Sequence, residues 1–267
     1  MIKPREIELD ASALDPSTRD NAIMPITPRI FGERGRRRAV SLGIEPERLP
    51  PGQSPTVKWP VLSLGGTPRV STEEWVLSID GAVEAPFALR WDAFTVLADA
   101  AWSGDIHCVT RWSNFNMDWG GADVSALIAR ARPTAQASHL MAHCYGGYTT
   151  NLPLSDVLEH PALIAHEADG APLEPDHGGP ARLLVPHLYL WKSAKWIQRR
   201  EILEADELGF WEQNGYHHRG DPWRQERYSV DDYIARAMRR SARERSWLSQ
   251  PGPTGRPSAP DCCPAMN

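Results

Sequence analysis

The feature that most constrains the fold is the repeated interruption of short apolar runs by turn-forming residues. The chain has 267 residues, of which 20 are glycine and 24 are proline, about 16% in sum against an average of roughly 12%. A helical bundle needs long uninterrupted helices, and this spacing of helix-breaking residues argues against them. Each apolar run is long enough for one strand or a few helical turns.

Strand-like and helix-like segments alternate along the chain. Short apolar runs bounded by turn residues predict strands at residues 75–81, 139–143, 163–166, 182–185 and 196–203. Apolar residues at helical spacing predict helices or single helical turns at residues 91–97, 123–130, 154–158, 205–211 and 229–247. The sequence shows no internal repeat. We therefore predict one α+β domain with mixed β-sheets and short helices.

The chain is predicted to have three parts. Residues 1–57 carry many turn signals and few long apolar stretches, which predicts an extended N-terminal arm with room for a short helix. Residues 58–245 form the folded domain. Residues 246–267 hold five prolines and no periodic apolar pattern, which is typical of a disordered tail.

Charge and hydropathy exclude two classes of partner. The net charge is −5 and the isoelectric point is near 6.0, so the chain lacks the excess of basic residues that nucleic-acid binding requires. No apolar run approaches the roughly 18 residues of a membrane-spanning helix. The arginines at 34 and 36–38 are not followed by the apolar stretch of an export signal. We expect a cytoplasmic protein, and we assign no role to these arginines.

Cys108 is the first candidate for chemistry. It lies beside His107 and Arg111, and cations of this kind stabilise a thiolate, which can act as a nucleophile or as a metal ligand. A buried structural thiol is the alternative, because free cysteines are among the most buried residues. His143 and Cys144 repeat the His-Cys pair, but adjacent residues of a strand point to opposite faces, which argues against a shared zinc site. Cys262 and Cys263 have no assigned role.

A second region concentrates positive charge. Gly178 and Gly179 allow the backbone to approach a ligand closely, and they precede three cations and one hydroxyl at Arg182, Lys192, Ser193 and Lys195. This combination suits a phosphate or another anion. A solvated pair of basic strands is the alternative. No Walker-type loop and no Gly-x-Gly-x-x-Gly motif is present.

A third region is a polar loop between aromatic residues, at 209–223. It contains Tyr216, His217 and Arg219, and functional residues often concentrate in such loops. The pair formed by His217 and His218 can equally be a plain exposed pair.

In this order, the three regions resemble the molybdenum-pterin domain of the sulfite oxidase superfamily. The resemblance runs from about residue 58 to residue 223. It rests on three motifs in combination: Cys-x-x-x-Trp-Ser from Cys108, Gly-x-Pro-x-Arg-x-x-x-Pro from Gly178, and Lys-x-x-Lys-Trp from Lys192. The resemblance implies that residues 58–245 form a molybdenum-pterin domain. It also implies a two-electron oxo transfer on a small substrate, either a sulfite-like anion or a sulfoxide.

The resemblance also implies roles for individual residues. Cys108 stands at the family's molybdenum ligand, which is chemically reasonable because a soft thiolate suits this metal. Tyr216 stands at the family's active-site tyrosine, and His217 follows it as a proton relay. The residues that stand at cofactor-binding positions are Lys58, Tyr145, His177, Arg182, Ser193, Ala194 and Lys195.

The sequence departs from the family's sulfite-oxidising members in several ways. Only one arginine, Arg111, follows the cysteine closely, which weakens the case for sulfite. No haem-binding motif is present, and the residues after Trp223 are too few for the family's immunoglobulin-like dimerisation domain. We therefore expect a monomer that exchanges electrons with a haem protein, a quinone or a flavin.

Two other classes of function stay open on the sequence alone. One is a cysteine-dependent hydrolase that pairs Cys108 with His107 or His143, which requires nucleophile and base within hydrogen-bond reach. The other is a non-catalytic protein that binds a pterin or another anion.

Overall fold

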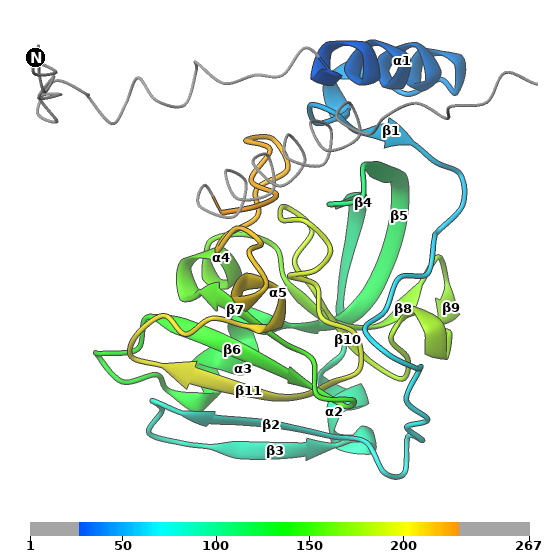
Figure 1. Ribbon diagram of the computed structural model, residues 1–267. Helices are drawn as coiled ribbons and strands as arrows, with labels where there is room; N and C mark the ends of the chain where they lie inside the picture. The colour runs from blue at the N-terminus through cyan, green and yellow to red at the C-terminus, as the bar shows by residue number, and fades with distance from the viewer. Residues whose placement is uncertain (1–26, 230–267) are drawn as a thin grey trace, which may run out of the picture.

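Two β-sheets share one hydrophobic core, and short helices connect and flank their strands (Figure 1). The computed structural model describes residues 27–229. Its mixed sheets and short helices confirm the predicted α+β class.

The first sheet is built around one long strand, β5. Its strands follow the order β1-β5-β8-β10, while β4 also pairs with β5 and β9 with β8. All these pairs are antiparallel except β1 with β5. The bounds are Ser54–Pro55 for β1, Ala100–Cys108 for β4, Trp112–Asp123 for β5, Leu163–Ala168 for β8, Ala171–Pro172 for β9 and Arg182–Leu184 for β10.

The second sheet has the order β3-β2-β11-β6-β7. Its pairs are antiparallel except β11 with β2. The bounds are Val76–Gly81 for β2, Phe87–Arg90 for β3, His139–Cys144 for β6, Thr149–Pro153 for β7 and Ile197–Leu203 for β11.

Five α-helices are described, and four of them are eight residues or shorter. Their bounds are Thr27–Ser41 for α1, Trp91–Leu97 for α2, Val124–Ala131 for α3, Leu154–Leu158 for α4 and Phe210–Gln213 for α5. Asp123 caps α3, because its side chain accepts a hydrogen bond from the backbone amide of Ser125.

The main core lies between the sheets. Leu77 and Ile79 alternate with half-buried neighbours along β2, and both belong to one buried cluster with residues of α3 and β8 such as Ile128 and Ile164. Trp75 is fully buried in this cluster, and its indole donates a hydrogen bond to the carbonyl of Ile197 at 3.0 Å. The period-two burial explains why the sequence predicts these strands correctly.

The hairpin of β4 and β5 is the main element that the sequence did not predict. Its strands contain Gly104, Gly120 and Gly121 together with polar residues, which are poor strand signals. At Gly121 a β-carbon would lie 2.1 Å from the carbonyl oxygen of Ile164. Close approach of the β8 backbone therefore requires the same glycine that hides the strand in the sequence.

The predicted helical turn at residues 205–211 is wrong. Helix α5 begins only at Phe210, and Gly209 before it packs against the backbone of Thr150, where a β-carbon would lie 2.5 Å from the Cα atom. The predicted helix at 229–247 and the predicted tail at 246–267 lie outside the described residues, apart from Ser229.

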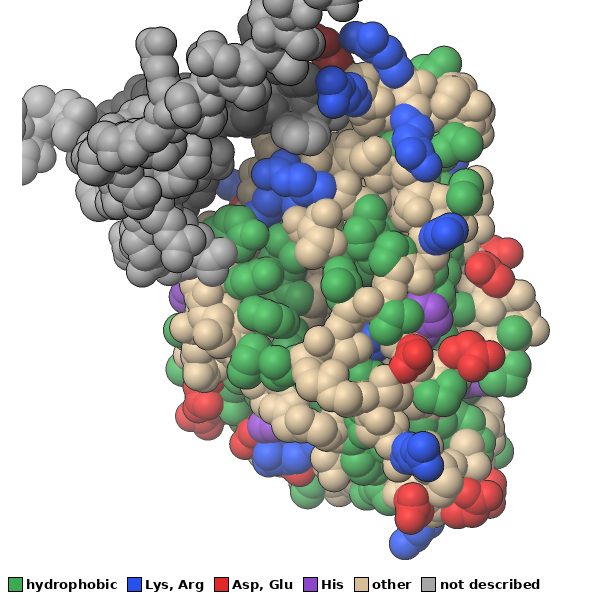
Figure 2. Space-filling view, turned by 45° about the vertical axis from the view of Figure 1, so that its right-hand side comes forward, with side chains coloured by type: hydrophobic (Ala, Val, Ile, Leu, Met, Phe, Trp, Pro, Cys, Tyr) green, Lys and Arg blue, Asp and Glu red, His purple; other side chains and the backbone are tan. Residues whose placement is uncertain are grey.

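The described part of the N-terminal arm contains α1 in addition to extended backbone. Gly35 and Ala39 bury one side of α1, and Gly35 contacts the carbonyl of Gln53. The opposite side exposes several arginines. Figure 2 shows Lys and Arg side chains gathered at the end of the molecule that carries α1, with most acidic side chains farther down. No helix among residues 27–229 is long and apolar enough to cross a membrane.

We expect two alanine substitutions in α1 to have opposite effects. At Gly35 a β-carbon would lie 2.2 Å from the Gln53 carbonyl oxygen, whereas at Gly32 nothing lies within 4 Å. Gly35→Ala should lower the free energy of unfolding by about 1–3 kcal/mol through overpacking. Gly32→Ala should raise it by up to about 1 kcal/mol through helix propensity. Urea unfolding measures both, and equal effects would contradict this packing of α1.

Candidate functional site

One cavity of about 350 Å³ brings together most of the residues that the sequence singled out. Its lining comes from within six segments of the chain: residues 59–68, 108–112, 145–148, 177–182, 190–196 and 211–216. Eight of the ten candidate residues line it: Cys108, Tyr145, His177, Arg182, Ser193, Ala194, Lys195 and Tyr216. The three sequence regions thus meet at one place.

Cys108 ends β4 and begins the turn that leads into β5. The turn closes when the amide of Arg111 donates to the carbonyl of Cys108 at 3.0 Å, with Arg111 in the left-handed region at φ 75°. The same carbonyl accepts a second hydrogen bond from the side chain of Gln53 at 3.0 Å. The turn that presents the thiol is therefore held from the N-terminal arm as well as from within.

The expected stabilisation of a Cys108 thiolate by His107 is wrong. Burial lowers the pKa of His107 to about 4, so this ring is neutral at physiological pH. Its Nδ1 lies 2.8 Å from Ser113 Oγ, while Cys108 Sγ lies 3.1 Å from Thr110 Oγ1. Burial also raises the pKa of Cys108, although hydrogen bonding by Thr110 and the charge of Arg227 oppose this. No positive charge on His107 activates the thiol.

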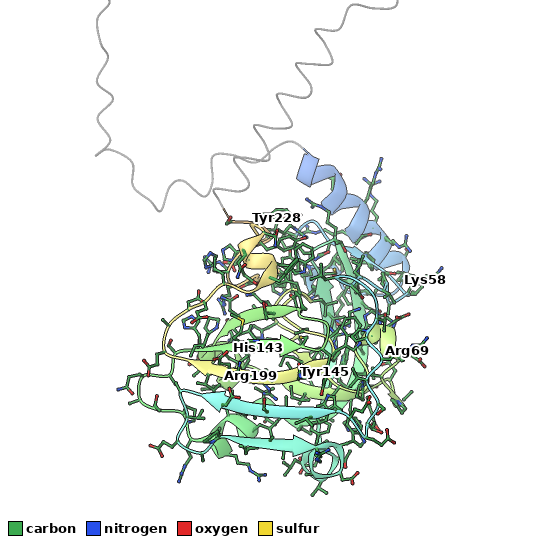
Figure 3. The ribbon with its side chains drawn as sticks, turned by 60° about the horizontal axis from the view of Figure 1, so that its bottom comes forward. Lys58, Arg69, His143, Tyr145, Arg199 and Tyr228 are labelled. Atoms are coloured by element: carbon green, nitrogen blue, oxygen red, sulfur yellow. The ribbon has the colours of Figure 1, made fainter. Side chains whose placement is uncertain are left out.

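This geometry also weighs against the hydrolase and zinc alternatives. Among the described residues, Cys108 forms no hydrogen bond with a histidine. His143 lies next to Arg199 on β11, and its Nε2 is 2.9 Å from Glu201 Oε2 (Figure 3). Within residues 27–229 the only cluster with metal-ligand spacing is Asp156, His160 and His187, which contains no cysteine.

Two cations lie side by side in the cavity lining without a carboxylate partner among the described residues. Arg182 on β10 is buried and donates to the carbonyls of His177 at 2.8 Å and Ser193 at 2.6 Å. Lys195 donates from Nζ to Ser63 Oγ at 2.8 Å and to the carbonyl of Asp176 at 2.7 Å. Burial lowers the pKa of Arg182 to about 10. Burial, and then the charge of Arg182, lower the pKa of Lys195 to about 8.

Gly178 allows these two cations to approach each other. It lies at φ 105°, and a β-carbon there would lie 3.0 Å from the Lys195 Cβ and 3.1 Å from the Arg182 Cβ. No other residue fits this conformation and this space without strain. Positive charge of this density, without a described carboxylate in ion-pair contact, suits a bound anion such as a phosphate.

The remaining candidates in the lining are held by the fold. Ser193 Oγ accepts a hydrogen bond from the amide of Val185 at 2.8 Å, and Ala194 is buried beside it. Tyr145 Oη accepts from the amide of Val76 at 3.0 Å. These contacts fix side chains at the same end of the cavity as Arg182.

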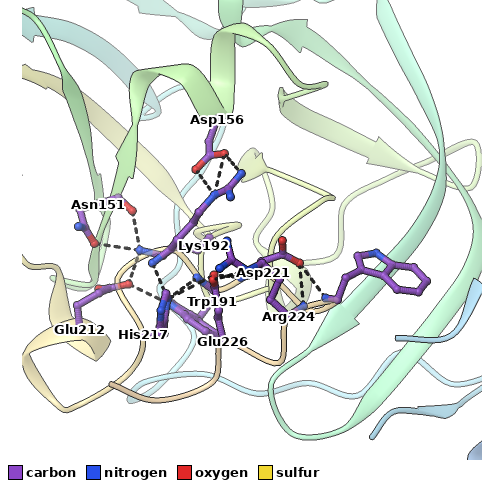
Figure 4. Close-up of polar contacts among 12 residues, drawn as sticks. Asn151, Asp156, Trp191, Lys192, Glu212, His217, Asp221, Arg224 and Glu226 are labelled. Carbon is purple, nitrogen blue, oxygen red and sulfur yellow. Dashed lines mark hydrogen bonds and ion pairs between the residues drawn. The ribbon is translucent and has the colours of Figure 1, made fainter. Parts of the chain in front are cut away.

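The end of the cavity near Cys108 is aromatic. The Tyr216 ring meets Trp191 edge-on at 5.2 Å and lies 4.9 Å from Trp211. The Trp191 indole donates to Glu212 Oε1 at 2.8 Å, and Glu212 also pairs with Lys192 at 2.6 Å, both charges being fully buried (Figure 4). A buried ion pair thus fixes the wall that carries Tyr216.

Two candidate residues lie outside the cavity lining. Lys58 is exposed at the edge of the molecule, apart from Tyr145 (Figure 3), and does not line the cavity. His217 does not line the cavity either, and its Nδ1 accepts hydrogen bonds from the backbone amides of Arg219 at 3.1 Å and Gly220 at 3.2 Å.

Sequence reasoning missed the segment that crosses the cavity from the N-terminal side. The Trp59 indole stacks on His177 at 3.8 Å, and Ser63 bonds Lys195. The available signal was an apolar stretch with a tryptophan just before Gly65 and Gly66. Nothing local in that stretch indicates that its partners lie more than a hundred residues away.

Comparison with known proteins decides the family. The family model described as "Oxidoreductase molybdopterin binding domain" matches residues 64–211. The chain belongs to this family. It is an oxidoreductase domain, and the cofactor of this family is molybdenum-molybdopterin.

Several known proteins resemble this molybdopterin-binding domain. "Uncharacterized oxidoreductase YuiH" of Bacillus subtilis is 40% identical over 185 residues, which cover 69% of this chain and 93% of the relative. The NADPH nitrate reductases of Beauveria bassiana and Pichia angusta are 24% and 25% identical over 64% and 63% of this chain. The chain spans 24% of each nitrate reductase. The solved sulfane dehydrogenase SoxCD of Paracoccus pantotrophus is 23% identical, with a TM-score of 0.49 over 52% of this chain and 41% of its own.

The residues present fit molybdopterin. The cofactor carries a phosphate, and Arg182 and Lys195 supply positive charge without an ion pair to a described carboxylate. The thiol of Cys108 lines the same cavity and offers the soft donor that molybdenum takes. The aromatic and imidazole faces of the lining suit the flat ring system of a pterin.

The loop that follows Tyr216 in this domain is tied down by Asp156. Arg219 donates to both oxygens of Asp156 at 2.8–3.2 Å, and His187 Nε2 lies 3.2 Å from Oδ1. Burial alone would raise the pKa of Asp156, but the hydrogen bonds of His187 and Arg219 lower it to about 2.

We expect this carboxylate to stabilise the fold above pH 4. Because the folded pKa lies below the unfolded value, the contribution of about 2 kcal/mol is complete above pH 4 and is lost as the pH falls toward 2. Asp156→Asn should remove it at pH 7. Urea unfolding at pH 7, 5 and 3 measures it, and Glu84→Gln at an exposed ion pair with Arg132 should change little. An unchanged stability of Asp156→Asn would contradict this role.

Proposed function

We propose that this chain catalyses two-electron oxo transfer on a small uncharged oxide, with Cys108 as the protein ligand of molybdenum. The observation that carries the proposal is the division of one cavity, with a thiol among aromatic rings at one end and two uncompensated cations at the other. When bound, molybdenum-molybdopterin supplies the two-electron oxo-transfer chemistry. The protein positions the cofactor and the substrate and tunes the reactivity of the cofactor.

The cationic end would hold the cofactor. Arg182 and Lys195 bind its phosphate, which replaces water around both groups and stabilises their charged forms. His177, Ser193 and Ala194 position it from the same side, and Tyr145 closes this end. Gly178 keeps the distance between the cations short enough for one anionic group to contact both.

At the other end, Tyr216 would act on the substrate. Its hydroxyl donates a hydrogen bond to the substrate oxygen, and Trp191 and Trp211 exclude water around it. His217 would relay the proton through Nε2, because its Nδ1 already accepts two backbone amides. Reduction of a sulfoxide takes two electrons and two protons and yields a thioether and water. A haem protein, quinone or flavin would deliver the electrons.

The substrate class follows from the charges at the Cys108 end. The side chains that line it are Trp112, Leu190, Trp191, Trp211 and Tyr216, which carry no positive charge. The neighbouring Arg111 and Arg227 do not line the cavity. An oxyanion here would lose its hydration without gaining a cation, which is unfavourable. An uncharged oxide with an apolar substituent, such as a sulfoxide or an N-oxide, fits these walls.

Cys108→Ala tests the molybdenum ligand, with Cys144→Ala as the matched control. Cys144 is equally buried, but it lies in the main core and does not line the cavity. We expect Cys108→Ala to retain pterin, to lose the thiolate-to-molybdenum absorption band and to lose at least a hundredfold in kcat. The control should keep all three. An unchanged absorption band in Cys108→Ala would contradict the assignment.

The substrate class is tested by comparing kcat/KM values of the molybdenum-loaded protein. With reduced benzyl viologen as electron donor, we expect methyl phenyl sulfoxide to exceed nitrate at least tenfold. With ferricyanide as acceptor, sulfite oxidation should be slower than sulfoxide reduction. A preference for nitrate or sulfite would overturn the uncharged class and leave the cofactor assignment intact.

A further inference from the structure

A second basic site lies against the Cys108 turn, and its two arginines do not line the cavity. Arg227 follows the loop of Tyr216 in the chain and is 6% exposed. Its Nη1 donates to the carbonyl of Val109, and its guanidinium lies 4.8 Å from the centre of the Tyr189 ring. Its Nε and Nη2 atoms are buried and have no hydrogen-bond partner among residues 27–229. A buried donor pair of this kind is costly unless something accepts from it.

A second guanidinium converges on the same point. A β-carbon at Gly52 would lie 3.1 Å from Arg111 Nη1 and 3.8 Å from Arg227 Nη2. Gly52 is buried at φ 72°, so glycine both adopts this backbone and keeps the space between the two arginines open. The Gln225 Oε1 atom lies 3.3 Å from the same point, and its amide can present its NH₂ group after a flip.

No described acid neutralises this pair. Neither Arg111 nor Arg227 forms an ion pair with a carboxylate within residues 27–229. Burial lowers the pKa of Arg227, and the charge of Arg111 lowers it further. Arg111 is exposed, so the space beside it is reached from solvent. Two guanidinium groups held together against their mutual repulsion suit a tetrahedral oxyanion, which each can bind through two donors.

We propose that Arg111 and Arg227 form an oxyanion-binding site for sulfate or phosphate, separate from the cavity. The bound anion would accept hydrogen bonds from Arg227 Nε and Nη2 and from Arg111 Nη1. It would link three segments that converge on the Cys108 turn: the N-terminal arm at Gly52, the turn itself at Arg111 and the chain after the Tyr216 loop at Arg227.

The test is titration of the cofactor-loaded full chain with sodium sulfate and with sodium phosphate. Calorimetry gives the Kd, and the change in Tm is compared with that in sodium chloride at equal ionic strength. We expect saturable binding of one anion and a Tm increase beyond that of chloride. Arg111→Gln, an exposed position, should weaken binding at least tenfold. Arg227→Lys keeps the charge but loses the paired N–H donors of the guanidinium group, and it should also weaken binding at least tenfold.

Arg224→Gln is the matched control. Arg224 is an exposed neighbour whose Nε lies 3.3 Å from Glu226, so its loss removes the same charge without touching the site. It should bind sulfate as the unmodified chain does. No response beyond that of chloride would overturn the proposal. Binding that survives Arg111→Gln would also overturn it, because the anion would then bind at another place on the cofactor-loaded chain.

Discussion

The functional cavity depends on the buried guanidinium of Arg182. Its two hydrogen bonds to the carbonyls of His177 and Ser193 join loops that the chain separates by sixteen residues, and those loops carry most of the cationic end. Removing a charge from water without a counter-charge is expensive. The fold tolerates the buried charge because backbone carbonyls accept hydrogen bonds from part of the guanidinium group. The remaining positive potential is what an anionic cofactor can use.

The neighbouring charges follow from the same constraint. Lys195 has a lowered pKa because burial removes water from around it and because Arg182 is close. One carboxylate could neutralise both Arg182 and Lys195. Lys192, which is three residues before Lys195 in the chain, is neutralised in this way by Glu212. There the pair is closed and structural, since it supports the wall formed by Trp191. Lys192 is therefore a structural cation, whereas Arg182 and Lys195 are available to bind an anion.

The sequence predicted the cationic end better than the rest of the site, for a local reason. Arg182, Ser193 and Lys195 fall within fourteen residues, so composition alone reveals the charge density. Trp59 and Ser63 also reach the cationic end. Ser63 accepts a hydrogen bond from Lys195, which lies 132 residues later in the chain, and no periodicity encodes such a contact. His107 shows the opposite failure: its proximity to Cys108 was evident, but its burial and neutrality depend on packing that only the fold supplies.

The strand pattern shows the same limit at the level of the fold. Strands β2, β6 and β11 were predicted because their burial alternates or runs continuously. β5 was missed, although it pairs with three other strands, because close approach of the β8 backbone requires Gly121, next to Gly120, where strand propensity favours branched residues. The residues that make a central strand possible here are the residues that make it hard to recognise.

The Cys108 turn separates two environments that one short segment of sequence cannot distinguish. Cys108, Thr110 and Trp112 line the cavity, while Arg111 reaches in the other direction toward Gly52 and Arg227. The left-handed conformation at Arg111 produces this division, because it reverses the course of the chain between β4 and β5. An arginine three residues after the thiol therefore gives no grounds for an anionic substrate. The same arginine, turned outward, meets a second buried guanidinium, and that pairing gives the outer face of the turn its affinity for an oxyanion.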